Sequence, residues 1–139
     1  KFILSEQKSG TLRLKTKSKP IFHYFKNYLE YISSHKHDTV RLKERPLTEA
    51  FKKGFLRGLI DTDGSVLRDK HGRRRVQYHT TSETLATQIH HMLTAFNVES
   101  TIQHYRHALG FKLLYRVNIR SRSIDTFLKT IKPFKGRGW

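Results

Sequence analysis

Apolar and polar positions alternate with two different periods along this chain. Segments 12–29, 76–93 and 115–131 each open with alternating apolar and polar side chains and continue with apolar residues at helical spacing. Alternation predicts a half-buried strand, and the later spacing predicts an amphipathic helix. Each predicted strand has one apolar face and one basic or polar face. We therefore expect an antiparallel sheet with helices on one side and an anionic partner on the other.

After residue 48 the pattern predicts helix, strand, strand, helix, strand, strand and helix, which places the fold in the α+β class. The first helix should follow Pro46 and present Phe51, Phe55, Leu59 and Ile60 on one face. Turn residues separate the two pairs of strands. The predicted elements are a helix over 48–62, strands 65–70 and 73–80, a helix capped by Ser82, strands 99–105 and 111–119, and a helix ending at 131.

Residues 11–33 predict a further strand and helix that resemble the end of another such order. Ser18 followed by Pro20 has the composition of a helix start. The basic stretch 34–45 is interpreted as a connector. We thus expect an N-terminal strand-helix extension with its connector over 1–45 and a core over 46–139. The apolar face of the N-terminal helix is expected to contain Ile21, Phe22, Phe25, Tyr28, Leu29 and Ile32.

Charge indicates the kind of partner. The 139 residues include 28 Lys and Arg against 11 Asp and Glu, a formal net charge of +17. A field of this size attracts polyanions, so nucleic acid is the expected partner. With 36% hydrophobic residues the chain has enough apolar side chains for one packed core. No apolar run is long enough to span a membrane, so we expect a soluble, intracellular protein with no membrane partner.

Several kinds of site are excluded or disfavoured by composition. The chain has no cysteine, which excludes disulfides, thiolate zinc sites, iron–sulfur clusters and a cysteine nucleophile. Histidines occur in pairs, but their basic surroundings favour surface or phosphate-contacting roles over metal ligation. These histidines are His35, His37, His90, His91, His104 and His107.

Residues 55–64 form an apolar helical run that ends in two carboxylates and a glycine. A helix dipole disfavours anions at the C-terminal end, so Asp61 and Asp63 indicate a bound divalent cation. Gly54 and Gly58 lie four residues apart on one helical face, where they permit close packing against a second copy of the run. Two such copies would bring two Asp63 carboxylates together. Paired carboxylates hold Mg²⁺ against a phosphodiester.

The segment Leu56 to Gly64 resembles the motif of the LAGLIDADG homing endonucleases at seven of nine positions. Arg57 and Thr62 depart from the pattern. The resemblance extends over the predicted αββαββα order and implies that family's core, in which an antiparallel sheet binds DNA. The matching residues are Leu56, Gly58, Leu59, Ile60, Asp61, Asp63 and Gly64.

The resemblance implies roles for individual residues. Asp63 corresponds to the metal-binding aspartate, and the carbonyl of Thr62 to a backbone metal ligand. Asp61 corresponds to the acid that stabilises the helix ends. Thr80 falls near the position where a polar side chain, often glutamine, orders water at the active site. Threonine in place of glutamine puts direct positioning of that water in question.

The family also implies a basic catalytic residue after the last core helix, beside the scissile phosphate. Lys135 is the first candidate and Arg137 the alternative. Both lie in the short segment 133–139, where the register of the match is open.

Strand parity predicts the DNA-contacting side chains. If Val76, Tyr78, Val117 and Ile119 face the helices, the intervening polar residues face outward, where a two-stranded ribbon can enter the major groove. Some would read bases and others only bind phosphate. The parity of 65–70 stays open. The primary candidates are Arg73, Arg75, Gln77, His79, Arg116, Asn118 and Arg120, and the weaker ones are Gln103, Tyr105 and Lys112.

The resemblance implies a site-specific, Mg²⁺-dependent endonuclease that cuts double-stranded DNA and leaves 3′ overhangs. The family needs two motifs for one active unit, and this chain has one. A homodimer on a near-palindromic target is the first interpretation. A separate N-terminal half as partner is the alternative, because residues 11–33 resemble the end of a preceding repeat.

Two other functions are compatible with part of the pattern. A non-catalytic binder on the same scaffold would be an RNA maturase that assists intron splicing or a DNA-binding regulator. A ribosome- or RNA-associated structural protein would account for the basic charge. Asp63 favours the nuclease, because a protein that only binds nucleic acid has no need to place an anion against phosphate.

Overall fold

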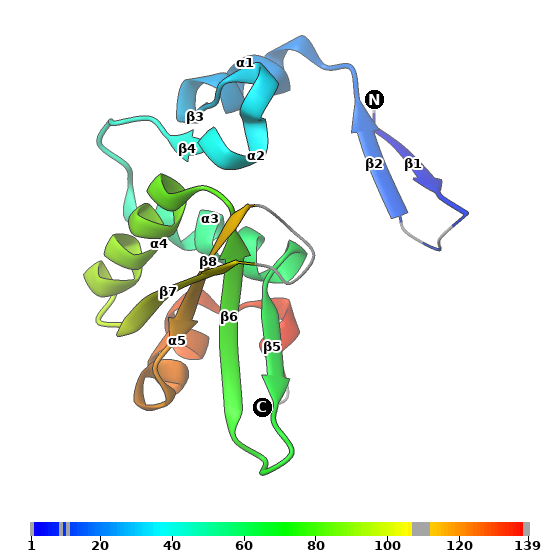
Figure 1. Ribbon diagram of the computed structural model, residues 1–139. Coiled ribbons are helices and arrows are strands. Elements are labelled where there is room, and N and C mark those ends of the chain that lie inside the picture. Colours follow the sequence, from blue (N-terminus) through cyan, green and yellow to red (C-terminus); the bar gives the residue numbers. More distant parts are fainter. Residues whose placement is uncertain (1, 9, 11, 107–111, 138–139) are drawn as a thin grey trace.

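The computed structural model describes residues 2–8, 10, 12–106 and 112–137 and contains a four-stranded antiparallel sheet packed against helices (Figure 1). Three short 3₁₀ turns complete it, at Ser33–His35, Ser121–Ser123 and Phe134–Gly136. The strands and helices, in chain order, are β1 (Phe2–Glu6), β2 (Leu12–Thr16), α1 (Lys19–Tyr28), β3 (Leu29–Glu30), α2 (Lys36–Thr39), β4 (Arg41–Leu42), α3 (Glu49–Thr62), β5 (Ser65–Arg68), β6 (Arg74–Thr80), α4 (Glu83–Ala95), β7 (Ser100–Arg106), β8 (Leu113–Ile119) and α5 (Ile124–Ile131).

The sheet has the strand order β5-β6-β8-β7, with each neighbouring pair antiparallel. Tyr78 lies opposite Val117, and His79 lies opposite Arg116. Because side chains alternate along a strand, the first pair faces the helices and the second faces the open side of the sheet. The predicted α+β class, the αββαββα order and the strand parity are confirmed.

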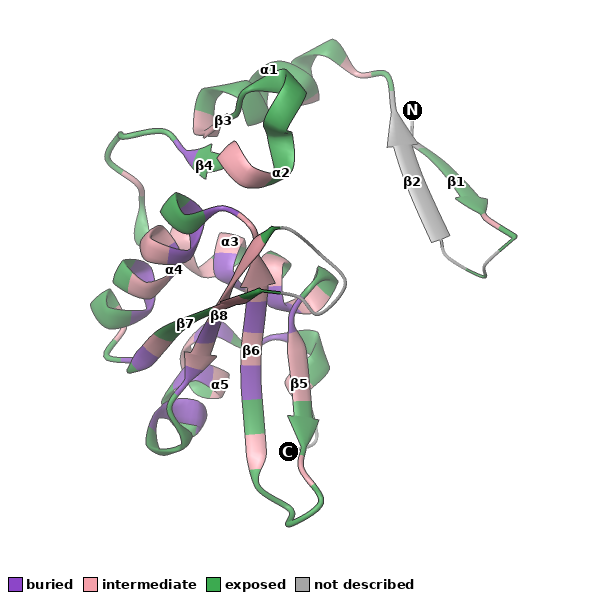
Figure 2. Ribbon diagram, in the orientation of Figure 1, coloured by how far each residue is buried: buried purple, intermediate pink, exposed green. Residues whose placement is uncertain are grey.

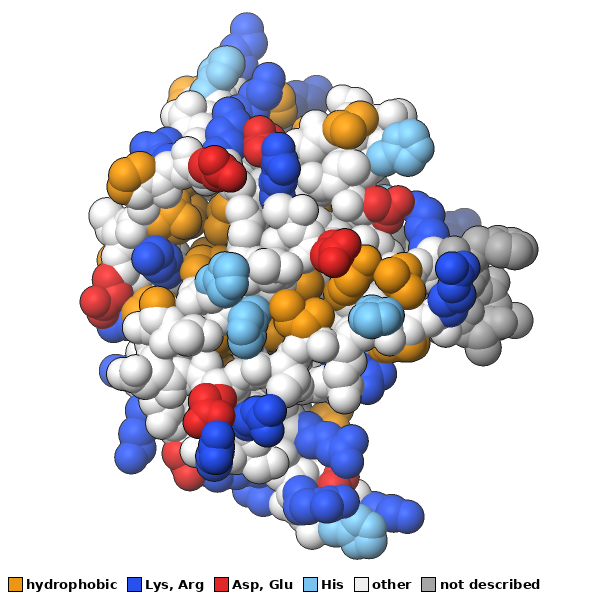
Figure 3. All heavy atoms as spheres, turned by 60° about the vertical axis from the view of Figure 1, so that its left-hand side comes forward, with side chains coloured by type: hydrophobic (Ala, Val, Ile, Leu, Met, Phe, Trp, Pro, Cys, Tyr) orange, Lys and Arg blue, Asp and Glu red, His pale blue; other side chains and the backbone are white. Residues whose placement is uncertain are grey.

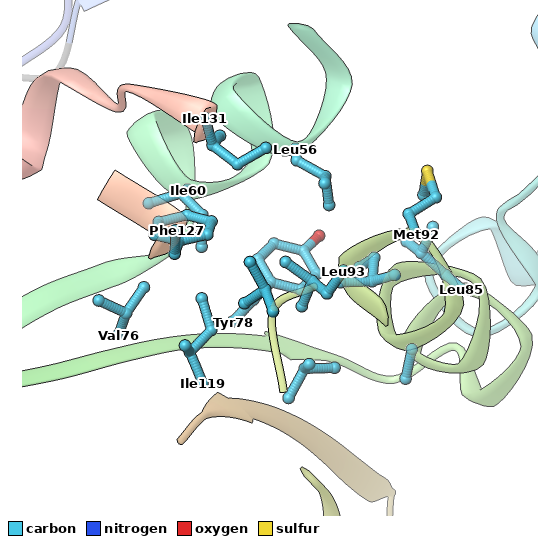
Figure 4. Packing of buried hydrophobic residues seen from close by; sticks show 14 of the residues in the cluster. Leu56, Ile60, Val76, Tyr78, Leu85, Met92, Leu93, Ile119, Phe127 and Ile131 are labelled. Atoms are coloured by element: carbon cyan, nitrogen blue, oxygen red, sulfur yellow. The ribbon is translucent and has the colours of Figure 1, made fainter. Parts of the chain in front are cut away.

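Buried side chains from all three core helices meet over the sheet. Leu56 and Ile60 of α3 lie beside Phe127 and Ile131 of α5, and Leu93 of α4 closes the cluster (Figure 4). Burial is concentrated in α4, α5 and β6, whereas β1 and α1 are largely exposed (Figure 2). Within the described ranges, no helix has both the length and the apolar character needed to cross a membrane.

Ile60 does not share a face with the other apolar residues of α3, contrary to the sequence prediction. Ile60 is 7% exposed and belongs to the core. Phe51, Phe55 and Leu59 are half-buried and border a groove on the side of α3 that carries Gly54 and Gly58. The two faces differ because successive helical residues are about 100° apart, so Leu59 and Ile60 diverge.

The N-terminal part differs from the predicted strand and helix. It begins with the hairpin β1–β2, which stands apart from the main sheet (Figure 1). The helix ends at Tyr28 instead of continuing to residue 33, because Leu29 and Glu30 pair with Leu42 and Arg41. Pairing with a strand about a dozen residues away outweighs the helical apolar spacing, which continues to Ile32.

The predicted basic connector is an ordered part of the fold. It contains α2 and β4, and Leu42 is 3% exposed within the core. The Gln88 side chain accepts a hydrogen bond from Leu42 N at 2.9 Å and donates one to Leu42 O at 2.8 Å. Residues upstream of 46 therefore pack onto α4. A domain boundary at residue 45 remains a prediction.

Candidate functional site

The C-terminal end of α3 is a tight turn that places Asp63 at the cap position. The backbone N–H groups of Asp63 and Gly64 both donate to Leu59 O, at 3.1 and 3.0 Å. A Cβ on Gly64 would lie 2.6 Å from Ile60 Cα, so no other residue fits without moving the backbone. The glycine lets the chain turn directly into β5, with Asp63 between the helix and the sheet.

Lys135 lies against this turn although it is more than seventy residues away in the sequence. Its Nζ donates to Gly64 O at 2.7 Å and to Thr62 O at 3.1 Å. Its backbone N–H donates to Asp61 Oδ1 at 3.1 Å. The other candidate, Arg137, stacks on Phe134 with its guanidinium carbon 3.8 Å from the ring centroid. Of the two basic candidates, the described hydrogen bonds bring Lys135 to the end of α3.

The oxygen atoms around Asp63 have the chemistry that a hard divalent cation requires. The carbonyls of Thr62 and Gly64 already accept hydrogen bonds from one cation, the Lys135 ammonium group. With the Asp63 carboxylate they form an oxygen-only donor set, which suits Mg²⁺. No cluster of three or more His, Cys, Asp or Glu side chains lies within the described residues. The set therefore fits a metal but supplies one carboxylate.

The charge of Asp63 also acts on the sheet beneath it. Burial, and in second place the negative charge of Asp63, raises the pKa of the Tyr78 phenol. Tyr78 is on β6, two residues before Thr80. Asp63 therefore lies within electrostatic range of the strand that carries Thr80.

The Thr80 side chain takes part in the turn from β6 into α4. Its Oγ1 accepts a hydrogen bond from Ser82 N at 3.1 Å. Ser82 caps α4 by accepting from Leu85 N at 3.2 Å, and its hydroxyl donates to Val40 O at 2.7 Å. The cap predicted at Ser82 is confirmed. A role for Thr80 in ordering water remains a prediction.

Arg57, one of the departures from the motif, points away from the glycine face of α3. Its Nε donates to Ile131 O at 2.8 Å, at the last residue of α5. The carbonyls at a helix C-terminus lack partners within the helix, so a guanidinium there stabilises that end. The positive charge of Arg57 is thereby used inside the chain and does not occupy the surface on which a second helix would pack.

The open face of the sheet forms a basic concavity of about 590 Å³. Six of the ten predicted DNA contacts line it: Arg75, Gln77, Gln103, Arg116, Asn118 and Arg120. The sequence prediction missed Arg74, Thr101 and Arg122. Thr101 has the same strand parity as Gln103, so the alternation used for the other strands contained a signal for it.

Three of the predicted DNA contacts are held by acidic residues. Arg73 Nε lies 2.9 Å and Arg75 Nη2 lies 3.4 Å from Asp69 Oδ2, at the turn between β5 and β6. Desolvation acts to raise the pKa of Asp69, but hydrogen bonds from Arg73 and His71 hold it below its usual range. Lys112 Nζ lies 2.8 Å from Asp38 Oδ2 in α2. The structure thus places Lys112 beside α2 and not in the concavity.

The hairpin β5–β6 extends the basic face. Ser65 pairs with Gln77 and Leu67 pairs with Arg75, which resolves the parity left open for 65–70. These residues face the open side of the sheet, and Arg68 has the opposite parity. Seen from the side of α4, Lys and Arg side chains gather at the lowest part of the molecule, where this hairpin turns (Figure 3).

Comparison with known proteins gives a family match and several partial likenesses. A family model described as a LAGLIDADG-like domain matches residues 50–132, which is more than half of the chain. Over 51 residues the chain is 52% identical to the RecA proteins of Mycobacterium tuberculosis and Mycobacterium bovis. Over 74 residues it is 38% identical to a DNA gyrase protein of Mycobacterium kansasii. The matches cover 6% of each RecA protein and 13% of the gyrase protein.

Solved structures of the homing endonuclease I-DmoI share the fold. Mesophilic variants of I-DmoI match with a TM-score of 0.66 and 21% identity, over 94% of this chain and 62% of that chain. I-DmoI in complex with DNA and Mn matches with a TM-score of 0.51 and 18% identity, over 94% and 87%. A match of this extent includes much of residues 1–45 as well as the core.

Proposed function

The chain belongs to the family of LAGLIDADG-like domains, and we propose that it is a metal-dependent, site-specific endonuclease for double-stranded DNA. One observation carries the proposal. The Asp63 carboxylate stands at the end of α3 among oxygens that already accept hydrogen bonds from a cation. The basic face of the adjoining sheet supplies the affinity for a DNA backbone.

The residues at the end of α3 would divide the work of hydrolysis. Asp63 and the Thr62 carbonyl would hold a hard divalent cation. When bound, such an ion lowers the pKa of a coordinated water and stabilises charge on the phosphate. Lys135, beside the same carbonyls, would place a positive charge near the oxygen atoms that become more negative. Water adds to phosphorus, the bond to the 3′ oxygen breaks, and that oxygen takes a proton; staggered cuts would leave 3′ overhangs.

A second motif helix would complete the site by packing on the groove beside α3. The groove has a volume of about 630 Å³ and a mainly aromatic and aliphatic lining. Nothing lies within 4 Å of where a Cβ on Gly54 or Gly58 would stand, so a helix backbone can approach closely there. That approach would bring a second acidic residue to Asp63. Besides the two glycines, the lining comprises Tyr24, Phe25, Tyr28, Leu29, Leu42, Phe51, Phe55, Leu59 and Thr62.

Two partners fit this groove. A second copy of the chain gives a homodimer with a near-palindromic target, as the single motif predicts. A separate N-terminal half is favoured by the I-DmoI likeness, because the match includes much of residues 1–45 within a chain of which it covers only 62%. The exposed aromatic side chains of α1, Phe22 at 54% and Tyr24 at 51%, extend the apolar surface available to either partner.

The test is cleavage of a DNA target chosen from a randomised library. With Mg²⁺ the protein is expected to linearise a plasmid that carries the selected site, and chelation by EDTA should lower the rate by at least about a thousandfold. Sequencing of the ends would show the overhang. Tight binding without nicking under Mg²⁺ or Mn²⁺ would sink the nuclease and leave the binder, and intron-splicing assays would then separate a maturase from a regulator.

Lys135→Met is expected to lower the cleavage rate by about a hundredfold, because it removes the positive charge beside the reacting phosphate. Arg137→Met is the matched control, since Arg137 stacks on Phe134 and makes no described hydrogen bond to the end of α3. Single-turnover cleavage with each variant measures the difference. Equal losses for the two variants would contradict a specific role for Lys135.

A further inference from the structure

Arg116, at the centre of the basic concavity, is held in one orientation by two neighbouring side chains. Its Nε donates to His79 Nε2 at 2.9 Å. Its guanidinium carbon lies 4.8 Å from the centroid of the Tyr105 ring. With Nε–H engaged, the two terminal amino groups remain free to act as a fork. Two parallel donors of this kind match O6 and N7 of guanine in the major groove.

The hydrogen bond to Arg116 requires His79 to be neutral. Arginine only donates, so His79 Nε2 accepts and the ring proton is on Nδ1. Burial, and in second place the charge of Arg116, lowers the pKa of His79. The ring therefore stays neutral near pH 7, and the orientation of Arg116 persists under ordinary conditions.

A pair of amides lies next to Arg116 on the same face. Asn118 Nδ2 donates to Gln103 Oε1 at 2.9 Å. The pair keeps a free N–H on one amide and a free carbonyl oxygen on the other. Reversing both amides exchanges the roles of the two residues but leaves the same donor and acceptor. One donor and one acceptor side by side match N7 and the 6-amino group of adenine.

The spacing of the two groups suits neighbouring bases. Gln103 lies opposite Arg116 across β7 and β8, and Asn118 is two residues farther along β8. Two residues of a strand extend about 6.6 Å, and successive bases of one DNA strand are about 3.4 Å apart. A strand that follows the groove therefore brings the two groups to bases no more than about two positions apart.

We propose that Arg116 reads a guanine and that the Gln103–Asn118 pair reads an adenine within two base pairs of it, with His79 as the positioning residue for Arg116. The proposal rests on DNA being the substrate of the proposed endonuclease. It assigns base specificity to these residues. Arg122, which forms an ion pair with Glu99 at the rim, is left to phosphate contact.

The test is selection of bound duplexes from a randomised library in Ca²⁺, followed by sequencing. Arg116→Leu is expected to erase a guanine at one position, and Asn118→Leu an adenine nearby, each with a ten- to hundredfold loss for the preferred site. Arg122→Leu should weaken binding to all sequences alike. His79→Leu should relax the guanine preference, and His79→Gln, which keeps an acceptor, should restore it.

Three results would overturn the assignment: equal weakening of all sequences by Arg116→Leu, a wild-type preference without guanine and adenine within two positions, or the same behaviour of His79→Gln and His79→Leu. Thermal unfolding of each variant confirms the fold, and Arg116→Gln replaces Arg116→Leu if the latter does not fold. Because binding is measured without cleavage, these results stand apart from the nuclease test. A protein that never cuts can still show the preference, and a nuclease with unchanged preferences defeats only this proposal.

Discussion

Asp63→Asn is expected to lower the rate of DNA cleavage by a thousandfold or more while leaving the affinity for the target within a few-fold of wild type. Asparagine has nearly the same shape as aspartate but carries no charge, so it binds Mg²⁺ far more weakly. The affinity should persist because the basic concavity on the open face of the sheet is untouched. Plasmid cleavage and binding of a labelled duplex, measured side by side, check both halves of the prediction.

Asp61→Asn is the matched control for this experiment. Asp61 Oδ1 accepts the backbone N–H of Lys135 at 3.1 Å, and an asparagine carbonyl can accept the same hydrogen bond. We therefore expect at most a few-fold loss of cleavage. If Asp63→Asn cleaves at the wild-type rate, or if both variants lose activity equally, Asp63 is not the particular metal ligand that the end of α3 indicates.

Gly58→Leu should abolish both assembly and cleavage while the single chain folds normally. Within the chain nothing lies within 4 Å of the Cβ position, so leucine meets open space. Replacing a helical glycine also favours the helix by about 1 kcal/mol. Toward a partner, however, leucine holds the two helix axes apart. Sedimentation should then show at least a hundredfold weaker association, and cleavage should fall at least as much because the second carboxylate is missing.

The control for this variant is Ala95→Leu, which adds an apolar side chain to an exposed residue at the end of α4. Association and cleavage should stay near wild type, and thermal unfolding should show both variants folded. Normal assembly of Gly58→Leu would mean that the groove beside α3 is not the contact surface, whether the partner is a second copy or a separate half.

Local periodicity explains why so much of the core was predictable. Alternation along 74–80 and 113–119 depends on neighbouring residues alone, and the structure places Tyr78 and Val117 toward the helices as that alternation requires. The cap at Ser82 and the turn at Gly64 likewise depend on a few adjacent residues. The limit of the approach shows at Leu29, where pairing with Leu42 ended a helix whose apolar spacing continued to Ile32.

The contacts that join distant parts of the chain were beyond the reach of the pattern. Periodicity could not choose between Lys135 and Arg137, because their distances to Thr62 depend on how α5 returns to the end of α3. The same holds for Arg57, whose partner is the carbonyl of Ile131, and for Lys112, which pairs with Asp38. Each contact joins residues more than seventy positions apart, so no local spacing encodes it.

Residue type and short-range spacing were enough to establish the family resemblance, the elements of the core, the basic face and the acidic end of α3. They could not establish which cation lies beside Asp63, which side chains orient Arg116, or that the glycines of α3 face an open apolar groove. These features depend on distances in space between residues that are far apart in the chain. Packing of the whole chain sets those distances.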